Sequence, residues 1–441
     1  MKKGWIAGLV VGVVVAVVGV HATTLHAKRA AGDDELYKQL ELFSDALSIV
    51  QADYVEQPEA KNLIYGAMKG MLATLDPYSQ FLDPDNYNEL KIETEGQFGG
   101  LGIEITVKDD LLTVITPIDD TPAYKAGLKP GDRIIKIDGV ITRGITLLDA
   151  VKKLRGKPGT SVVLTMLREG ENELKDVTLM RDIIKIQSVR DVQMLESHIG
   201  YVRLSDFREN TPEDMQAALD KLKSGQMEGM ILDLRNDPGG LLDVAVTSAE
   251  LFLDRQQLIV TTKGRLKNQN LEFRSRREGA IKDLPVVVLI NEGSASASEI
   301  LAGAIQDHHR GVIMGTKSHG KASVQTIFPL KDGSALRLTT SKYYTPAGRM
   351  IHGQGIIPDV VVPFEAPPKE KENKGQQAQE IFDHAEHPDN NQDKGKEPDK
   401  GKEPDKEKSD APKFVIDNQM ARAIDLLKGI RVLQAAKKVT P

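Results

Sequence analysis

Apolar residues are spaced in several different ways along this chain, and each spacing predicts a different kind of structure. The first is an uncharged apolar run, Trp5 to Val20, which follows two lysines and precedes small residues up to Ala27. A charged start, an apolar stretch and small residues succeed each other in this order in export signals. The run is close to the roughly 20 apolar residues that span a membrane. Residues 1–27 are therefore expected to be an export signal or a membrane anchor.

The next pattern is helical. Apolar residues recur at helical spacing from Glu35 to Ala73, and a second such run spans Ala60 to Leu75. We therefore predict a helical amino-terminal region over residues 28–95. Such a region serves either as a dimerisation or docking element or as a simple packing arm, and the sequence leaves both interpretations open.

Between residues 96 and 181 the pattern changes to short strands separated by turns. A glycine-rich loop, Gly99 to Gly102, opens this region, and the segment AYKAGLKPGD, Ala123 to Asp132, lies in its middle. Together the two segments resemble a PDZ domain. The glycines let backbone N–H groups point at a carboxylate, and the following strand offers an edge to which a peptide can add. The resemblance implies a binding site for protein tails at Gly100, Leu101, Gly102 and Ile103.

Between residues 182 and 364 strand-like and helix-like segments alternate, which argues for an α/β core. One junction has the sequence DLRNDPGG, Asp233 to Gly240, whose paired glycines allow the backbone to approach a substrate closely. An ordinary strand-to-helix turn is the alternative. The predicted fold class is thus mixed α/β, with a PDZ β-domain inserted between a helical region and an α/β core.

The region from 365 to 413 is poor in apolar residues and contains near-repeats of the sequence DKGKEP. Such a composition cannot bury enough apolar surface to offset the entropy of ordering, so we expect a disordered charged linker. Helical spacing returns after Phe414. Residues 414–441 are predicted to form a helix that docks on the rest of the chain.

The composition excludes several kinds of function. The 441 residues carry a net charge of −6, with 58 Lys and Arg against 64 Asp and Glu, so nothing indicates a nucleic-acid partner. There are no cysteines, which excludes disulfides, thiol catalysis and thiolate metal sites. We expect no metal ion and no other cofactor.

The strongest indication of chemistry is the run NEGSASASE, Asn291 to Glu299, which follows the apolar segment Val286 to Ile290 and opens a helix-like one. A small-residue turn between a buried strand and a helix can expose a nucleophilic hydroxyl beside N–H groups that receive an oxyanion. Ser296 lies at the centre of this run. The alternative is that the serines only cap a helix, with an acid nearby that suits the helix dipole.

A serine hydroxyl needs a base that accepts its proton. Five nitrogen bases follow the run: His308, His309, Lys317, His319 and Lys321. Histidine is the usual base, whereas a lysine must be desolvated so that its pKa falls. Gln325 lies four residues after Lys321, on the same side of a strand or of a helical turn. Its amide oxygen can hold the amine without adding a negative charge.

Taken together, these motifs resemble the carboxyl-terminal processing proteases, which are PDZ-containing serine peptidases with a Ser-Lys dyad. The resemblance rests on the PDZ loop, the DLRNDPGG segment, the SASASE run, the segment GKASVQ that begins at Gly320, and the segment YYTPAGR that begins at Tyr343. It implies a protease core of crotonase-like or Clp-protease-like character. It also implies that Ser296 is the nucleophile, Lys321 the base and Gln325 the residue that orients the base.

By the same resemblance, the oxyanion hole uses the backbone N–H of Ala297 and that of Gly239 or Gly240, and the choice of glycine stays open. Two positions depart from the family pattern. His319 stands just before the glycine of the base motif, and Ala322 stands where family members often carry a second glycine. Neither removes a group that the mechanism requires, but the first keeps a Ser-His scheme open.

The resemblance also implies partners. Substrates are exported or membrane-associated proteins whose free apolar carboxyl termini bind the PDZ groove, and PDZ closure gates activity in related enzymes. An adaptor protein is a candidate partner, and a homo-oligomer is expected to form through the amino- and carboxyl-terminal helices. The expected location is periplasmic or otherwise extracytoplasmic, with an inner-membrane anchor if residues 1–27 are retained.

Our prediction is an exported serine endopeptidase that recognises protein tails through its PDZ domain and cleaves by a Ser-Lys acyl-enzyme route. A non-catalytic PDZ scaffold is the rival from another class of function, although a scaffold needs none of Ser296, Lys321 and Gln325. A thioester site on a crotonase-like core is disfavoured by the inserted PDZ domain and by the export segment.

Overall fold

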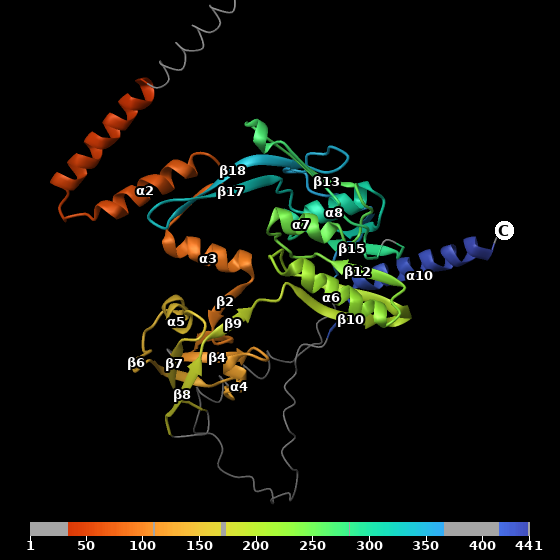
Figure 1. Cartoon of the computed structure of the whole chain (residues 1–441), viewed down its shortest axis with the longest axis horizontal. Coiled ribbons are helices and arrows are strands. Elements are labelled where there is room, and N and C mark those ends of the chain that lie inside the picture. Colours follow the sequence, from red (N-terminus) through yellow and green to blue (C-terminus); the bar gives the residue numbers. More distant parts are fainter. Residues whose placement is uncertain (1–33, 109–110, 169–172, 282, 366–413, 440–441) are drawn as a thin grey trace, which may run out of the picture. The chain divides into compact units, whose positions relative to one another are not determined.

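The structure is a computed structural model that describes residues 34–108, 111–168, 173–281, 283–365 and 414–439 (Figure 1). The predicted export segment and residues 366–413 of the predicted linker lie outside the described residues. The chain divides into two compact units, one of Met1–Asp85 with Thr326–Leu338, the other of Asn86–Gln325 with Thr339–Pro441. Within the described residues, no helix has both the length and the apolar composition that crossing a membrane requires.

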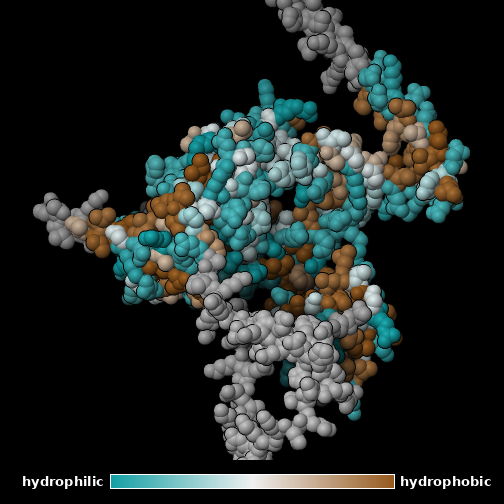
Figure 2. All heavy atoms as spheres, turned by 180° about the vertical axis from the view of Figure 1, so that it is seen from behind, coloured by the Kyte–Doolittle hydropathy of each residue, from teal (hydrophilic) through white to brown (hydrophobic). Residues whose placement is uncertain are grey.

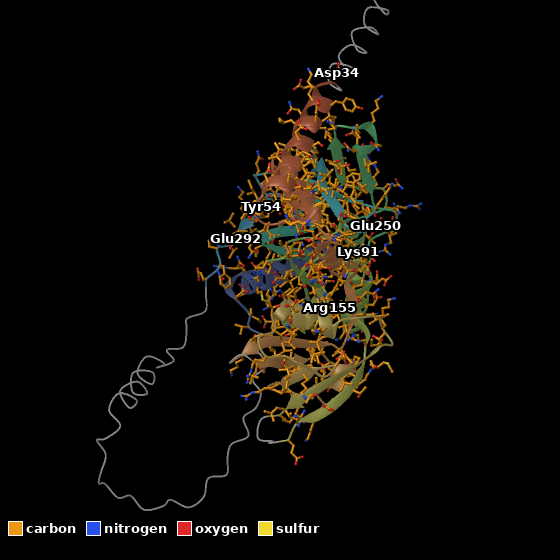
Figure 3. All side chains as sticks on the ribbon, turned by 90° about the vertical axis from the view of Figure 1, so that its left-hand side faces the viewer. Asp34, Tyr54, Lys91, Arg155, Glu250 and Glu292 are labelled. Atoms are coloured by element: carbon orange, nitrogen blue, oxygen red, sulfur yellow. The ribbon has the colours of Figure 1, made fainter. Side chains whose placement is uncertain are left out.

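The smaller unit consists mainly of helices. A helix over residues 34–53 precedes α2 (Ala60–Ala73), and β1 (Gln80–Leu82) pairs antiparallel with the start of β18 (Ala335–Tyr344). The ring of Tyr65 packs on Phe81 with centroids 4.7 Å apart. The helix over residues 34–53, whose first residue Asp34 is labelled in Figure 3, exposes apolar side chains that appear as brown atoms in Figure 2. These exposed side chains include Leu36, Leu40, Phe43, Ile49 and Val50.

The larger unit contains a small antiparallel β-domain. Its sheet has the order β3-β4-β5-β7-β8 with β6 paired to β5, so β3 lies at an edge. Strands β2 and β9 pair with each other where the chain enters and leaves this domain. The elements of this part of the chain are α3 (Pro84–Glu95), β2 (Gln97–Gly100), β3 (Ile103–Lys108), β4 (Leu111–Pro117), α4 (Pro122–Lys125), β5 (Arg133–Ile137), β6 (Val140–Ile141), α5 (Leu147–Leu154), β7 (Ser161–Leu167), β8 (Lys175–Met180) and β9 (Asp182–Lys185).

Close packing explains the glycine loop of this domain. Gly102 has φ 74°, and a Cβ at this position would lie 2.2 Å from the Cβ of Thr121. Only glycine fits such a conformation and such a contact. The carbonyls of Leu101 and Gly102 accept the N–H groups of Ala123 and Ile118 at 2.9 and 2.8 Å, which fixes the loop against the start of α4.

The α/β core is a six-stranded sheet in the order β10-β11-β12-β15-β16-β19, in which every pair is parallel except β10 with β11. Met230 and Leu232 of β12 pack with the helices α6, α7 and α8, whereas Ile231 packs against α10. Burial on both faces explains the continuous apolar runs of the central strands. The elements are β10 (Val189–Leu195), η1 (Glu196–His198), β11 (Ile199–Leu204), α6 (Thr211–Ser224), β12 (Gly229–Asp233), α7 (Leu242–Ala249), β15 (Val286–Ile290), α8 (Ala297–Asp307), β16 (Val312–Gly315), β19 (Val360–Val361) and α10 (Asn418–Val439).

A second, antiparallel sheet completes the chain. It joins β13 (Leu258–Gly264), β14 (Leu271–Arg274) and β17 (Ser323–Pro329) to β18, with the short helix η2 (Lys267–Gln269) between β13 and β14. Helices, a parallel sheet and antiparallel sheets therefore coexist in one chain. The predicted mixed α/β class is confirmed.

Substitution in α10 tests whether this helix belongs to the core. Leu427 is fully buried against the sheet with Ile231, whereas Val432, five residues further along, is 70% exposed. We expect Leu427→Ala to lower the free energy of unfolding by about 2–5 kcal/mol through lost burial and cavity formation, and Val432→Ala to lower it by less than about 0.5 kcal/mol. Urea denaturation measures both, and equal effects would contradict the docking of α10.

Candidate active site

The turn between β15 and α8 carries the serine run and is organised by Asn291. The Oδ1 of Asn291 accepts the N–H groups of Asn236 and Gly293 at 2.8 and 3.0 Å, and its Nδ2 donates to Asn236 Oδ1 at 2.9 Å. Ser296 ends the turn with φ 55° and ψ −111°, a conformation that L-residues rarely adopt. Such strain costs about 1–3 kcal/mol and is concentrated at functional sites, as in nucleophile elbows.

The three serines of the run have different surroundings. Ser294 is fully buried and its hydroxyl donates to Leu234 O at 2.7 Å, and buried Ser298 donates to Asp237 O at 2.9 Å. These two hydroxyls hold the turn. Ser296 is half-buried, and its side chain makes no capping hydrogen bond although it precedes α8. Ser296 as the nucleophile stays a prediction, beside the alternative that it caps α8 together with Glu299.

The DLRNDPGG turn lies directly against Ser296. A Cβ on Gly239 would be 2.8 Å from the Ser296 Cβ and 2.7 Å from the Ala297 nitrogen, so only glycine allows this approach. Gly240 packs instead on Phe207, whose carbonyl oxygen would lie 2.0 Å from its Cβ. Ala297 opens α8, and its N–H is among the helix amides that lack an intrahelical acceptor. The Gly239 N–H donates to Asp237 Oδ1 at 2.8 Å, so the choice of oxyanion glycine stays a prediction.

The segment with the proposed base reaches the same place. The N–H of Lys321 and the N–H of Ser296 both donate to Oε2 of Glu299 at 2.9 Å. The two backbone nitrogens therefore lie within two hydrogen-bond lengths of each other. Lys321 is half-buried between β16 and β17. Gln325, four residues on in β17, donates from Nε2 to Ser323 Oγ at 3.2 Å.

The histidines differ in position. His308 and His309 follow the last residue of α8, an 11-residue helix whose length of about 16 Å separates them from Ser296. His308 Nε2 is also hydrogen-bonded to Leu258 O at 2.6 Å. His319 has an exposed side chain, and its backbone N–H donates to Ser294 O at 2.9 Å. Of the three histidines considered from the sequence, His319 remains an alternative to Lys321 as the base.

Two further residues lie in this cluster: Glu299, which the sequence indicated only as an acid suited to the helix dipole, and Tyr343, to which it gave no role of its own. Both are 1% exposed. Glu299 connects the serine turn to the lysine segment, and the Tyr343 hydroxyl lies 3.1 Å from Ser296 O and is also hydrogen-bonded to Lys321 O. The available signal for Glu299 was its place three residues after Ser296, as in a capping box. Nothing in the sequence indicated the contacts of Tyr343.

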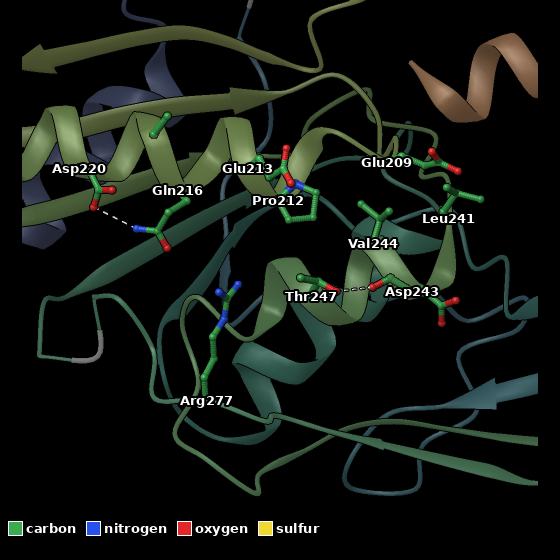
Figure 4. Close-up of a pocket in the computed structure, with 11 residues that line it drawn as sticks. Glu209, Pro212, Glu213, Gln216, Asp220, Leu241, Asp243, Val244, Thr247 and Arg277 are labelled. Atoms are coloured by element: carbon green, nitrogen blue, oxygen red, sulfur yellow. Dashed lines mark hydrogen bonds between the residues drawn. The ribbon is translucent and has the colours of Figure 1, made fainter. Parts of the chain in front are cut away.

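A groove between α6 and α7 begins one residue beyond the paired glycines, at Leu241 (Figure 4). Four of its eleven lining residues are acidic, namely Glu209, Glu213, Asp220 and Asp243, and Arg277 is basic. Within the groove, Gln216 donates to Asp220 at 2.9 Å. Neither Ser296 nor Lys321 lines this groove. The groove is therefore distinct from the cluster of predicted catalytic residues.

Asp237 is a fully buried carboxyl group in the turn beside Ser296. Its Oδ1 accepts the Gly239 N–H, and its Oδ2 has no hydrogen-bond partner among the described residues. Burial raises the pKa of Asp237 to about 8, Asp206 adds to the rise, and the Gly239 N–H opposes it. The neutral acid is thus the favoured form of Asp237 near pH 7.

The raised pKa of Asp237 predicts how stability depends on pH. Between about pH 4 and pH 8 the folded state keeps a proton that the unfolded state releases, so this group's contribution to stability is lost as the pH rises, by up to about 1.4 kcal/mol per pH unit. We expect Asp237→Asn to remove this slope in urea denaturation at pH 5 to 8, and Asp220→Asn, at an exposed position of α6, to keep it. Identical slopes in wild type and Asp237→Asn would show that the carboxyl is ionised.

Comparison with known proteins agrees with this arrangement. Residues 198–362 match Peptidase family S41, residues 99–179 match the PDZ domain, and residues 14–86 match the Activating protease CtpB N-terminal domain. Among the residues that the structure describes, no cluster of three or more histidine or acidic side chains is placed to hold a metal ion.

Curated relatives share most of the chain. The carboxy-terminal-processing protease of Bartonella bacilliformis is 47% identical over 77% of this chain and 78% of its own length. The carboxy-terminal processing protease CtpA of Bacillus subtilis is 34% identical over 77% of this chain and 72% of its own length. Among solved structures, a photosystem II D1 C-terminal processing protease is 31% identical, with a TM-score of 0.42 over 73% of this chain and 92% of that chain. The chain belongs to the carboxyl-terminal processing proteases, the PDZ-containing serine peptidases of family S41.

Proposed function

We propose that this serine peptidase is an exported endopeptidase that binds protein carboxyl termini through its PDZ domain and cleaves by a Ser-Lys mechanism. One observation carries the catalytic part. Ser296 stands in a strained turn against Gly239, and its backbone shares a hydrogen-bond acceptor with the backbone of Lys321. A nucleophile, a candidate base and candidate oxyanion donors thus meet at one point.

The proposed reaction has two stages. Lys321, as a neutral amine, accepts the proton of the Ser296 hydroxyl while the oxygen attacks the scissile carbonyl. The N–H of Ala297 and that of Gly239 or Gly240 stabilise the oxyanion. Lys321 then returns the proton to the leaving amine, and a water activated by the same amine hydrolyses the acyl-enzyme. Gln325 orients the Lys321 amine.

Tail recognition is supported by the build of the PDZ domain. Strand β3 lies at an edge of its sheet, and the loop before it holds Gly102 in a left-handed conformation with φ 74°. An edge strand can take up an extended peptide, and a glycine loop can direct N–H groups at a terminal carboxylate. Gly100, Leu101, Gly102 and Ile103 would bind the last residue of the substrate.

Export and assembly belong to the same proposal. The order of charged, apolar and small residues in 1–27 supports an extracytoplasmic location, as a cleaved signal or an inner-membrane anchor. The exposed apolar side chains of the helix over residues 34–53 support association of protein surfaces there. We propose homo-oligomers through the terminal helices, and an adaptor protein as a further partner.

Three variants test the base. We expect Ser296→Ala and Lys321→Ala to lower kcat at least about 1,000-fold on an unstructured protein with an apolar carboxyl terminus, and His319→Ala to retain most of it. If instead His319→Ala lost activity and Lys321→Ala retained it, His319 would be the base that accepts the serine proton. An inactive wild type that binds tails tightly would instead make the protein a scaffold.

Tail recognition is tested by the charge at the end of a peptide. A fluorescent peptide with an apolar carboxyl terminus is compared by anisotropy with the same peptide amidated at its end. Loss of charge-assisted hydrogen bonds, worth about 1.5–3 kcal/mol, should weaken binding at least about 10-fold. Equal affinities would contradict recognition of the terminal carboxylate.

A further inference from the structure

Glu299 receives hydrogen bonds from two separate segments of the chain. From its own helix start, the Ser296 N–H donates to Oε2 at 2.9 Å. From the segment that leads into β17, the Ser318 hydroxyl and the Gly320 N–H donate to Oε1 at 2.6 and 2.7 Å, and the Lys321 N–H donates to Oε2 at 2.9 Å. Four donors on two oxygens is close to the full acceptor capacity of a carboxylate.

A capping role explains only part of this arrangement. An acid three residues into a helix commonly accepts the N–H of the residue before the helix, which accounts for the bond from Ser296. It does not account for three donors that lie 19 to 22 residues further along the chain. A solvated capping glutamate would also be exposed, whereas Glu299 is 1% exposed.

Tyr343 reinforces the connection from another element. Its hydroxyl lies 3.1 Å from Ser296 O, is hydrogen-bonded to Lys321 O, and approaches Glu299 Oε2 at 3.5 Å. Its own N–H donates to Ala322 O at 3.1 Å, which fixes β18 beside the lysine segment. The N–H groups of Ser296 and Lys321 thus share Glu299, and the single hydroxyl proton of Tyr343 lies within reach of both their carbonyls.

We propose that Glu299 is a positioning residue that holds the backbone of the nucleophile and the backbone of the base at a fixed separation, with Tyr343 as its auxiliary. This role rests on the proposed Ser-Lys mechanism. The strained conformation of Ser296 needs an external constraint, and the bond from its N–H to Glu299 supplies one. Because proton transfer depends on the distance between hydroxyl and amine, a shift of about 1 Å costs on the order of 100-fold in rate.

Glu299→Gln is the primary test, because glutamine keeps the length and volume of the side chain. With the amide N–H₂ at Oε1, Ser318 and Gly320 lose their acceptor, and with it at Oε2, the N–H groups of Ser296 and Lys321 lose theirs. We expect kcat to fall at least about 100-fold with KM within about twofold. Reaction of Ser296 with a fluorophosphonate probe should slow equally per folded molecule. Glu299→Asp keeps a carboxyl group on a shorter side chain, and it should retain no more than a small part of the wild-type kcat.

Glu250→Gln is the matched control. Glu250 is 6% exposed at the end of α7 (Figure 3), where it accepts the Arg276 N–H at 3.0 Å and pairs with Arg277. Both variants remove a buried carboxylate, so both are expected to lower the melting temperature. Only Glu299→Gln should lower kcat and probe reactivity once the folded fraction is normalised.

Tyr343→Phe provides a second variant in case Glu299→Gln does not fold. It should lower kcat about 10-fold with KM unchanged. The double variant with Glu299→Gln should lower kcat by less than the product of the two single effects, because both residues fix the same distance between Ser296 and Lys321. Wild-type kcat in folded Glu299→Gln, or in Tyr343→Phe alone, would overturn the proposal. An inactive wild type would instead refute the Ser-Lys mechanism on which it rests.

Discussion

The pairing of β12 with β15 is the constraint on which the site depends. The two strands run parallel in the centre of the sheet, so their following turns leave from the same edge, where ligands bind in open α/β sheets. Several hydrogen bonds then join the turns, among them those from Leu234 N–H to Leu289 O, from Ser294 Oγ to Leu234 O and from Ala295 N–H to Asp237 O, at 2.9, 2.7 and 2.9 Å. The register of the sheet therefore brings Gly239 close to Ser296, and the hydrogen bonds between the turns hold the two residues there.

Polar groups that pack this closely must be hydrogen-bonded, since each unsatisfied buried group costs about 1–3 kcal/mol. The side chains of Asn291, Ser294 and Ser298 meet this demand by bonding across the two turns. Asp237 Oδ2 is an exception among the described residues, and it lies in the turn that touches the nucleophile. A protonated acid at that position avoids a buried negative charge next to the place where an oxyanion would form, so its raised pKa is consistent with catalysis as well as with burial.

Sequence reasoning reached the residues whose signal is local. The strand-turn-helix pattern around Ser296 and the glycine pairs at Gly102 and Gly239 depend on neighbours in the chain, and the mixed α/β class follows from periodicity. The structure separates His308 and His309 from Ser296 by the length of α8, which no spacing rule could exclude in advance. The contacts of Glu299 with Ser318 and Lys321, and of Tyr343 with Ser296, join segments 19 to 47 residues apart and depend on tertiary packing. Domain limits and catalytic roles taken from the resemblance remain predictions.

The carboxyl-terminal helix contributes to the same turn from the opposite face of the sheet. Arg235, between Asp233 and Asp237, donates to Asp233 at 2.6 Å and, outward, to Asp417 and Gln419 at 2.8 Å each. Removing one partner of a buried ion pair costs about 3–5 kcal/mol, because the other charge is left uncompensated. Arg235 is therefore held on one side by Asp233 and on the other by the start of α10. Since Asp237 and Gly239 follow it directly, α10 supports the turn behind the nucleophile even though residues 366–413 separate the two in sequence.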